Sequence, residues 1–186
     1  YAVPWPAQGL YSKKSINSVD DLKGLKFRAY NSATIRIAEL TGMAPTKIEA
    51  AEISQAFSTG AVESMITSPT TGKNSKIWEN GVGYFYDIAA WFPKNMVIVN
   101  KDSWNKLDDA TKKLVMSEAA IAERKGWDLS KKGNVADKKA LSDAGMKVGK
   151  VNSALQKHFQ NVGATMSEEW KQKAGSRGAS VLAAYK

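Results

Sequence analysis

The side chain with the clearest potential for chemistry is an arginine in DLKGLKFRAYN, residues 21–31 of this 186-residue chain. Arg28 lies near the end of a predicted strand, and Asn31 follows where a helix is expected to begin. In open α/β sheets, ligands bind outside the carboxyl ends of strands and beside helix N-termini. A guanidinium there can grip a carboxylate through two charge-assisted hydrogen bonds. These residues predict an anion site, although an ion pair of Arg28 with Glu49 or Glu52 explains the sequence equally well.

A second polar cluster follows another predicted strand, in MITSPTTGKN, residues 65–74. The strand leads into hydroxyl groups that could donate to a ligand, namely Thr67, Ser68, Thr70 and Thr71. An ordinary helix-capping loop uses the same residue types. The stretch GKNSK is no phosphate-binding P-loop, because the G-x-x-x-x-G-K-[ST] spacing is missing.

The composition gives little support to catalysis or metal binding. The chain has no cysteine, which excludes disulfides, thiolate nucleophiles and cysteine-ligated metals. Its single histidine, His158, lies in a predicted helix and is expected to be structural or solvent-facing. No G-x-S-x-G stretch accompanies that histidine. We therefore expect no catalytic residues, no metal and no cofactor.

The formal charge of +9 raises the alternative of nucleic-acid binding. Residues 1–93 carry nine basic and eight acidic side chains, whereas residues 94–186 carry eighteen and ten. The excess is nearly all lysine, on a predicted helical region, and no aromatic residues alternate with it. Nucleic-acid readers favour arginine and stacking aromatics. Arg36, one of only four arginines, lies on the helix after Asn31 and is expected to face solvent. We interpret the lysines as a solvated surface and expect no nucleic-acid partner.

The first half of the chain alternates helix and strand signals, separated by glycine turns. The expected elements are a helical turn at 18–24, strands at 25–30, 45–50 and 61–68, helices at 31–42, 51–60 and 70–80, and a buried strand from Met96 to Asn100. This order predicts a mixed or parallel sheet covered by helices.

The second half is mostly helical. Residues 107–145 form a predicted long helix, with Asp108 and Asp109 at its start, where the helix dipole favours them. Its apolar spacing makes Leu114, Val115, Ala119, Ala122 and Trp127 the inward candidates. A short strand at 146–152 and three helical pieces follow. No apolar run approaches the ~18 residues of a membrane span, and the first ten residues lack the features of a signal peptide.

Taken together, these stretches carry a family resemblance. Residues 18–79 resemble the second lobe of the substrate-binding proteins of tripartite ATP-independent periplasmic (TRAP) transporters, the DctP-like family. The family pattern is a D-L-K-G-L-K-x-R strand, a helix, then a second helix ending in TGAVE or similar and a strand that enters the pocket. WFPKNMVIVNKDSWNKLDDATKKLV, residues 91–115, resembles the family's return strand and the start of its long helix.

The resemblance assigns roles to particular residues. It implies that Arg28 binds a substrate carboxylate and that Asn31, Thr67 and Ser68 contact the ligand. Relatives often have asparagine in the loop where Thr67 stands here. Trp91 and Gln8 complete the expected ligand-binding set, and Trp5 is a further candidate to line the pocket, although tryptophan is more often core.

The resemblance also implies a fold and its division. We expect an α/β, periplasmic-binding-protein-like two-lobed fold with mixed sheets, a long connecting helix and an incomplete first lobe. Tyr1 in place of methionine fits a processed chain or fragment that lacks the family's N-terminal portion. The expected parts are an inter-lobe crossing segment at 1–8, the ligand-binding second lobe at 9–92, a return strand and long helix belonging to the first lobe and connector at 93–145, and a C-terminal strand and helices across the lobes at 146–186.

The function implied is capture of an organic acid in the periplasm and its delivery to TRAP membrane subunits, without catalysis. An aromatic, branched, hydroxy or keto acid is equally compatible with the residues. A fragment of such a protein is expected to expose apolar surface and open strand edges, and so to self-associate. The alternatives are a basic nucleic-acid-associated α/β protein and an enzyme on a similar fold.

Overall fold

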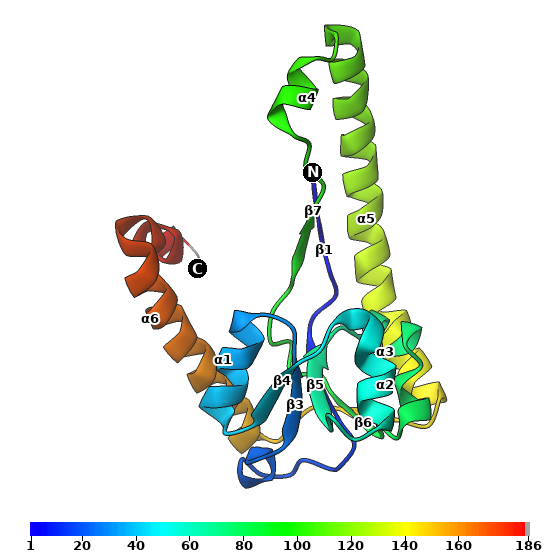
Figure 1. The fold of residues 1–186 in the computed structure, drawn as a ribbon, viewed down its shortest axis with the longest axis vertical. Helices are drawn as coiled ribbons and strands as arrows, with labels where there is room; N and C mark the ends of the chain where they lie inside the picture. Colours follow the sequence, from blue (N-terminus) through cyan, green and yellow to red (C-terminus); the bar gives the residue numbers. More distant parts are fainter. Residues whose placement is uncertain (185–186) are drawn as a thin grey trace.

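The computed structural model describes residues 1–184 and is built around one six-stranded mixed sheet (Figure 1). The strand order is β4-β3-β5-β2-β6-β8. β3 is parallel to β4 and β5, and β6 is parallel to β8, whereas β2 is antiparallel to β5 and β6. The bounds are β2 Gly9–Ser12, β3 Lys26–Ala29, β4 Ala44–Lys47, β5 Ser64–Thr67, β6 Tyr84–Tyr86 and β8 Lys147–Gly149. The expected mixed α/β architecture is confirmed.

Helices connect these strands, and most of them lie where the sequence predicts them. Asn31 caps α1 through a reciprocal capping box with Thr34, and the helix ends at Gly42, whose φ of 76° suits glycine. The helical elements of this part are η1 Asp20–Leu22, α1 Ser32–Thr41, η2 Ala50–Glu52, α2 Ile53–Ser58, α3 Pro69–Asn74 and η3 Ile77–Asn80. Local cap residues thus determine where these elements begin and end.

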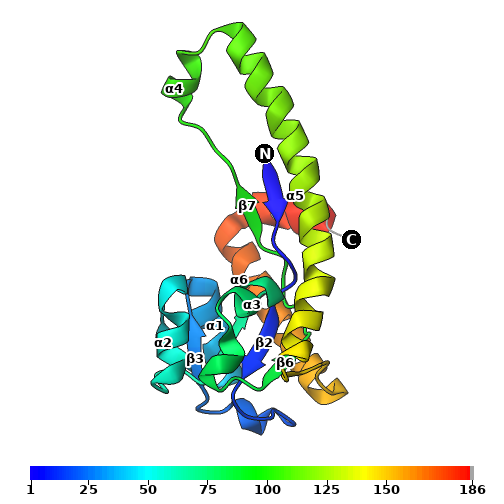
Figure 2. The ribbon, with the colours of Figure 1, turned by 90° about the vertical axis from the view of Figure 1, so that its right-hand side faces the viewer.

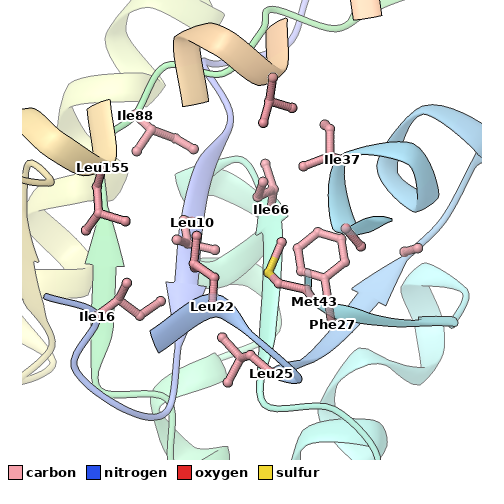
Figure 3. Close-up of a cluster of buried hydrophobic side chains, with 13 residues drawn as sticks. Leu10, Ile16, Leu22, Leu25, Phe27, Ile37, Met43, Ile66, Ile88 and Leu155 are labelled. Carbon is pink, nitrogen blue, oxygen red and sulfur yellow. The ribbon is translucent and has the colours of Figure 1, made fainter. Parts of the chain in front are cut away.

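Each face of the sheet buries its own apolar cluster, because successive strand residues point to opposite faces. Leu10, Phe27 and Ile66 belong to the cluster under α1, shown in Figure 3. Tyr11 and Met65, their neighbours in β2 and β5, belong to the cluster on the other face. This alternation decides to which side of the sheet each site residue points.

A long arm extends from the sheet, away from the lobe formed by the elements above (Figures 1 and 2). It consists of the antiparallel strands β1 Ala2–Pro4 and β7 Lys94–Met96, the helix α4 Lys101–Asn105 and the 35-residue helix α5 Asp109–Asp143. Asp108 caps α5 by accepting a hydrogen bond from the Thr111 amide at 2.8 Å. A Cβ at Gly126 would lie 2.5 Å from Val3, so the missing side chain allows β1 to lie against α5.

Two burial predictions on this arm are wrong. The stretch Met96–Asn100, expected to be a buried strand, has only Met96 in β7, and Ile98 is 84% exposed. On α5, Leu114, Val115 and Trp127 are also exposed instead of facing inward. An apolar pattern shows that a surface suits burial, but burial requires a second surface. Within residues 1–184 these side chains remain mostly uncovered, and β1 reaches only Trp127, whose Nε1–H donates to the Ala2 carbonyl at 3.1 Å.

The C-terminal region is also simpler than the three helical pieces expected from the sequence. α6 Ser153–Ala184 runs through the first two of them without a break and, after a kink at Gly175 with φ 63° and ψ −148°, through the described part of the third. Arg36 of α1 binds Glu169 of α6 at 2.5 Å, so the two helices are tied together. Among the described helices, none is both long enough and apolar enough to cross a membrane.

Candidate functional site

The sheet brings most of the predicted site residues to one of its edges. β3 and β5 are parallel, so Asn31 and Thr67 follow strand ends on the same side. β2 is antiparallel to β5, with Gly9 opposite Thr67, so Gln8 lies at this edge too. The backbone amide of Gln8 donates to the Trp91 carbonyl at 3.0 Å, which places the segment after β6 beside Gln8. Figure 1 shows β1 and β7 leaving the lobe from this edge.

Arg28 is buried, with only 4% of its surface exposed, and it has no acidic partner within residues 1–184. Its Nε–H donates to the carbonyl oxygen of Ile48 at 2.8 Å. Glu49, which the sequence offered as a partner, instead pairs with Lys47 at 3.4 Å. Burial lowers the pKa of the guanidinium, and Glu49 opposes this shift only as a neighbouring charge. The Glu52 carboxylate accepts from the Glu49 amide at 3.2 Å and forms no pair with Arg28 in the described residues. The alternative of an ion pair with Glu49 or Glu52 is therefore wrong.

The orientation of the guanidinium is fixed from two sides. Besides the bond to Ile48, its central carbon lies 4.6 Å from the ring centroid of Tyr30. The two terminal nitrogens make no hydrogen bond within the described chain and retain the donors of the planar fork. An arginine that is buried, oriented and unneutralised is chemically suited to bind a carboxylate end-on.

Tyr30 is a candidate site residue that the sequence analysis missed. Burial raises the pKa of its phenol, while the Arg28 charge lowers it. The central carbon of the Arg28 guanidinium lies 4.6 Å from the Tyr30 ring centroid, so this ring is the aromatic neighbour of the arginine. Its position two residues after Arg28 on an extended segment was the available signal, because such residues share a face of the sheet.

Asn31 and Thr67 each keep a polar group available at this edge. The Asn31 Oδ1 atom caps α1 by accepting from the Thr34 amide at 2.9 Å, and its Nδ2 group has no acceptor in residues 1–184. The Thr67 side chain is buried, and its hydroxyl likewise has no partner in that part of the chain. Both groups can bind a ligand without breaking an existing contact.

The Ser68 hydroxyl, in contrast, is already engaged. It accepts from the Trp5 Nε1–H at 2.7 Å and from the Thr71 amide at 3.0 Å, and it shares a hydrogen bond with the Thr71 hydroxyl. The Ser68 carbonyl accepts from the Tyr11 phenol at 3.0 Å. The structure thus shows Ser68 holding the local backbone.

Gln8, like Ser68, forms hydrogen bonds that hold the local backbone. It is buried, and its Nε2 group donates back to the Pro6 carbonyl at 2.9 Å. Its backbone carbonyl accepts from the Ala90 amide at 2.9 Å, which fixes the backbone of Gln8 against residues 90–91.

A pocket of about 510 Å³ opens beside this edge, between α1, residues 88–91 and α6. Of the predicted site residues, Asn31 and Trp91 line it. Its other walls are mainly apolar, with Ile37, Ile66 and Phe159 among them. Arg28 lies across from Met65, which belongs to the opposite face of the sheet. The structure therefore collects the predicted residues along one edge without enclosing them in a single cavity.

The described residues offer little to a metal ion. No group of three or more histidine or carboxylate side chains is positioned to hold one within residues 1–184. His158 lies on α6 with its ring 6.0 Å from that of Phe159. The chemistry of the edge is thus that of hydrogen bonding and of the Arg28 charge.

Comparison with known proteins identifies relatives of this chain. Residues 7–173 match the family described as DctP, bacterial extracellular solute-binding protein, family 7. The sialic acid-binding periplasmic protein SiaP of Vibrio cholerae is 31% identical over 107 residues, which cover 56% of this chain and 32% of that protein.

Solved structures match the whole chain. DctP6 of Bordetella pertussis, a receptor that binds pyroglutamic acid, is 40% identical with a TM-score of 0.96, over 100% of this chain and 61% of that one. A TRAP solute-binding protein from a marine metagenome, specific for pyroglutamate, is 37% identical with a TM-score of 0.95, over 100% and 60%.

These matches fix the family and its general character. The chain spans about a third to a half of the curated relatives and about 60% of the solved ones. The relatives are solute receptors of TRAP transporters, which confirms the resemblance and the expectation of a binding protein over an enzyme. The chain belongs to the bacterial extracellular solute-binding proteins of family 7, the DctP family.

Proposed function

We propose that this chain supplies the carboxylate-binding lobe of a TRAP solute receptor, with Arg28 as the clamp for a small organic acid. Asn31, Thr67 and Trp91 are the further ligand contacts. Gln8 and Ser68 act on the same site by holding its backbone.

The observation that carries this proposal is the state of Arg28. A buried cation is costly unless it is paired, and such groups occur where function requires them. Here the guanidinium is 4% exposed, is held by Ile48 and Tyr30, and has no carboxylate partner in the described residues. A ligand carboxylate would supply the missing charge.

Pyroglutamate is the first ligand to test. The two structural neighbours that are 37% and 40% identical are described as binding it. It is a compact ring with one carboxylate for Arg28 and a lactam whose carbonyl and N–H need a donor and an acceptor. The free Nδ2 group of Asn31 and the Thr67 hydroxyl are suited to those groups.

Calorimetry on the full-length gene product separates the parts of this proposal. The probes are pyroglutamate, cyclopentanecarboxylate, which keeps the carboxylate on an apolar ring, and 2-pyrrolidinone, which keeps the lactam without the carboxylate. We expect pyroglutamate to bind tightest, cyclopentanecarboxylate to bind more weakly, and 2-pyrrolidinone not to bind. Equal binding of 2-pyrrolidinone and pyroglutamate would contradict a carboxylate clamp.

The partners and location follow from the family. We propose that the protein acts in the periplasm and presents its bound acid to TRAP membrane subunits. In this arrangement residues 1–8 cross between lobes, 9–92 form the ligand-binding lobe, 93–145 form the return strand and connecting helix, and 146–186 pack across the lobes. Loss of acid uptake on deletion of the gene, restored by the wild-type gene and not by an Arg28→Ala version, is the expected cellular result.

A further inference from the structure

The long helix α5 is attached to the lobe by two adjacent residues of opposite charge. Asp137 is 5% exposed and accepts from the Thr70 hydroxyl at 2.6 Å and from Lys73 Nζ at 2.7 Å. Both partners belong to α3. Lys138, the next residue, pairs with Asp87. Consecutive helix residues point in directions about 100° apart, so one turn of α5 reaches two different segments of the lobe.

The two segments that α5 holds both lead directly into the candidate site. α3 begins immediately after Thr67 and Ser68. Asp87 follows the end of β6 and precedes residues 88–91, which end in Trp91. The backbone amide of Asp87 also donates to the Gly149 carbonyl of β8 at 2.7 Å, so the backbone that carries the carboxylate is held in place. Two site segments at one edge of the sheet are thus held by a single turn of one helix.

Asp137 also acts on Tyr11, the residue whose phenol holds the Ser68 backbone. The Tyr11 phenol donates to the Ser68 carbonyl, and the pKa of that phenol is raised by burial and further by the negative charge of Asp137. A Cβ at Gly72 would lie 2.2 Å from the Tyr11 oxygen, so α3 and Tyr11 are in close contact. A shift of the α5 turn would therefore move α3 and the loop before it.

The rest of α5 belongs to the arm. Asp137 and Leu141, near its C-terminal end, are its buried residues, and the helix continues away from the lobe beside β1 and β7 (Figure 2). A 35-residue helix at 1.5 Å per residue is a lever of roughly 50 Å. This lever meets the lobe at Asp137, Lys138 and the buried Leu141, of which the first two make polar contacts with defined segments of the lobe.

We infer that Asp137 and Lys138 are positioning residues that couple the geometry of the ligand-binding edge to the orientation of α5. Through Thr70 and Lys73, Asp137 holds the segment that carries Thr67 and Ser68. Lys138 holds, through Asp87, the segment that carries Trp91. Ligand binding that stabilises one arrangement of these segments then stabilises one orientation of the arm, and the coupling acts in both directions. This inference rests on the proposed function for the identity of the ligand.

Adjacent variants of α5 provide a matched test. In the full-length gene product, Asp137→Ala removes both α3 contacts, and Lys138→Met removes the pair with Asp87. The control is Asp143→Ala, because Asp143 pairs with Lys139 at 2.6 Å within the same helix and holds no other segment of residues 1–184. A swap, Asp87→Lys with Lys138→Asp, restores the second pair with reversed signs.

Two measurements are made on each variant. Pyroglutamate affinity and dissociation rate are measured by calorimetry and stopped-flow tryptophan fluorescence, and hydrogen exchange is followed at residues 67–74 and 87–91 without ligand. We expect Asp137→Ala and Lys138→Met to weaken binding by about fivefold or more, the lower end of typical coupling between sites. Faster dissociation and faster exchange in the segment that each residue holds should accompany the loss. The control should match wild type, and the swap should recover most of the affinity.

The inference would be overturned if folded Asp137→Ala and Lys138→Met proteins both showed the affinity and the hydrogen exchange of the wild type. Equal losses in the Asp143→Ala control would do the same, because the effect would then be general destabilisation of α5. If the wild-type protein binds no organic acid, the proposed function fails separately. The positioning role is then judged by exchange at residues 67–74 and 87–91 alone.

Discussion

Removal of Arg28 is the most direct test of the carboxylate clamp. Arg28→Ala deletes the fixed cation together with its bond to Ile48, and leaves a bound carboxylate in a poorly solvated place without its main partner. Losing one member of a buried, hydrogen-bonded charge pair costs about 2–5 kcal/mol. This loss corresponds to about 30-fold to several thousand-fold in affinity. With only 4% of Arg28 exposed, water cannot readily replace it, and we expect a result within this range.

Two further substitutions at this position separate charge from geometry. Arg28→Lys keeps the charge, but an ammonium cannot reproduce the planar fork while also bonding Ile48 as the Nε–H does, so binding should be only partly restored. Arg28→Met keeps much of the volume and removes the charge. Because burial lowers the pKa of Arg28, the charged form is less favourable in the folded protein than in the unfolded chain. We expect the Met variant to unfold at or above the wild-type temperature without ligand, and to gain nothing from ligand.

The assay is calorimetry with pyroglutamate, supported by thermal unfolding with and without ligand. Lys26→Ala is the control, because Lys26 is an exposed cation on the same strand whose Nζ donates to the Gly60 carbonyl. Arg36, which was expected to face solvent, is a poorer control, since its pair with Glu169 ties α1 to α6 beside the pocket. A folded Arg28→Ala protein that binds within about twofold of wild type would refute the clamp.

Three further predictions concern packing, association and charge. Gly72→Ala should lower the free energy of unfolding by about 1–3 kcal/mol, because the new methyl would overlap the buried Tyr11 ring. The control Gly163→Ala meets open space in α6 and should not lower it. Equal unfolding temperatures for Gly72→Ala and the wild type would disprove the overlap. The 186-residue chain by itself should self-associate through the exposed strand edges and apolar side chains of the arm; light scattering should show oligomers that Met96→Lys with Ile98→Lys reduces, and a monodisperse wild-type monomer would contradict this. Binding to DNA should be weak, non-specific and abolished by moderate salt, because exposed lysines supply only a Coulombic attraction; sub-micromolar, sequence-dependent binding in a gel-shift assay at physiological salt would refute it.

The local elements were predictable because their determinants are close in sequence. Asn31 and Gly42 bound α1 in the structure as they do in the sequence pattern, since a cap acts over three or four residues. The alternation of short strands and helices likewise predicted the mixed sheet, and Arg28 was identified from its place at a strand end.

Burial was less predictable, because it depends on surfaces from elsewhere. Ile98 and Leu114 have the spacing of core residues, yet both are exposed in the arm. The opposite error was possible at Arg28, whose side chain was as compatible with a surface ion pair as with a buried clamp. Only the packing around β3 shows that it is buried and that it has no acidic partner among residues 1–184.

Hydrophobic periodicity and caps are short-range properties of the chain, so the type of fold and the residue types at one edge of the sheet could be read from the amino-acid order. Which of those residues remain available, and what holds them, depends on tertiary packing. It engages Ser68 through Trp5, stacks Tyr30 on Arg28, and joins Asp137 to Thr70 across 67 residues of sequence. Such contacts join residues far apart in the chain, so no local pattern records them, and they exist only once the sheet and α5 have packed together.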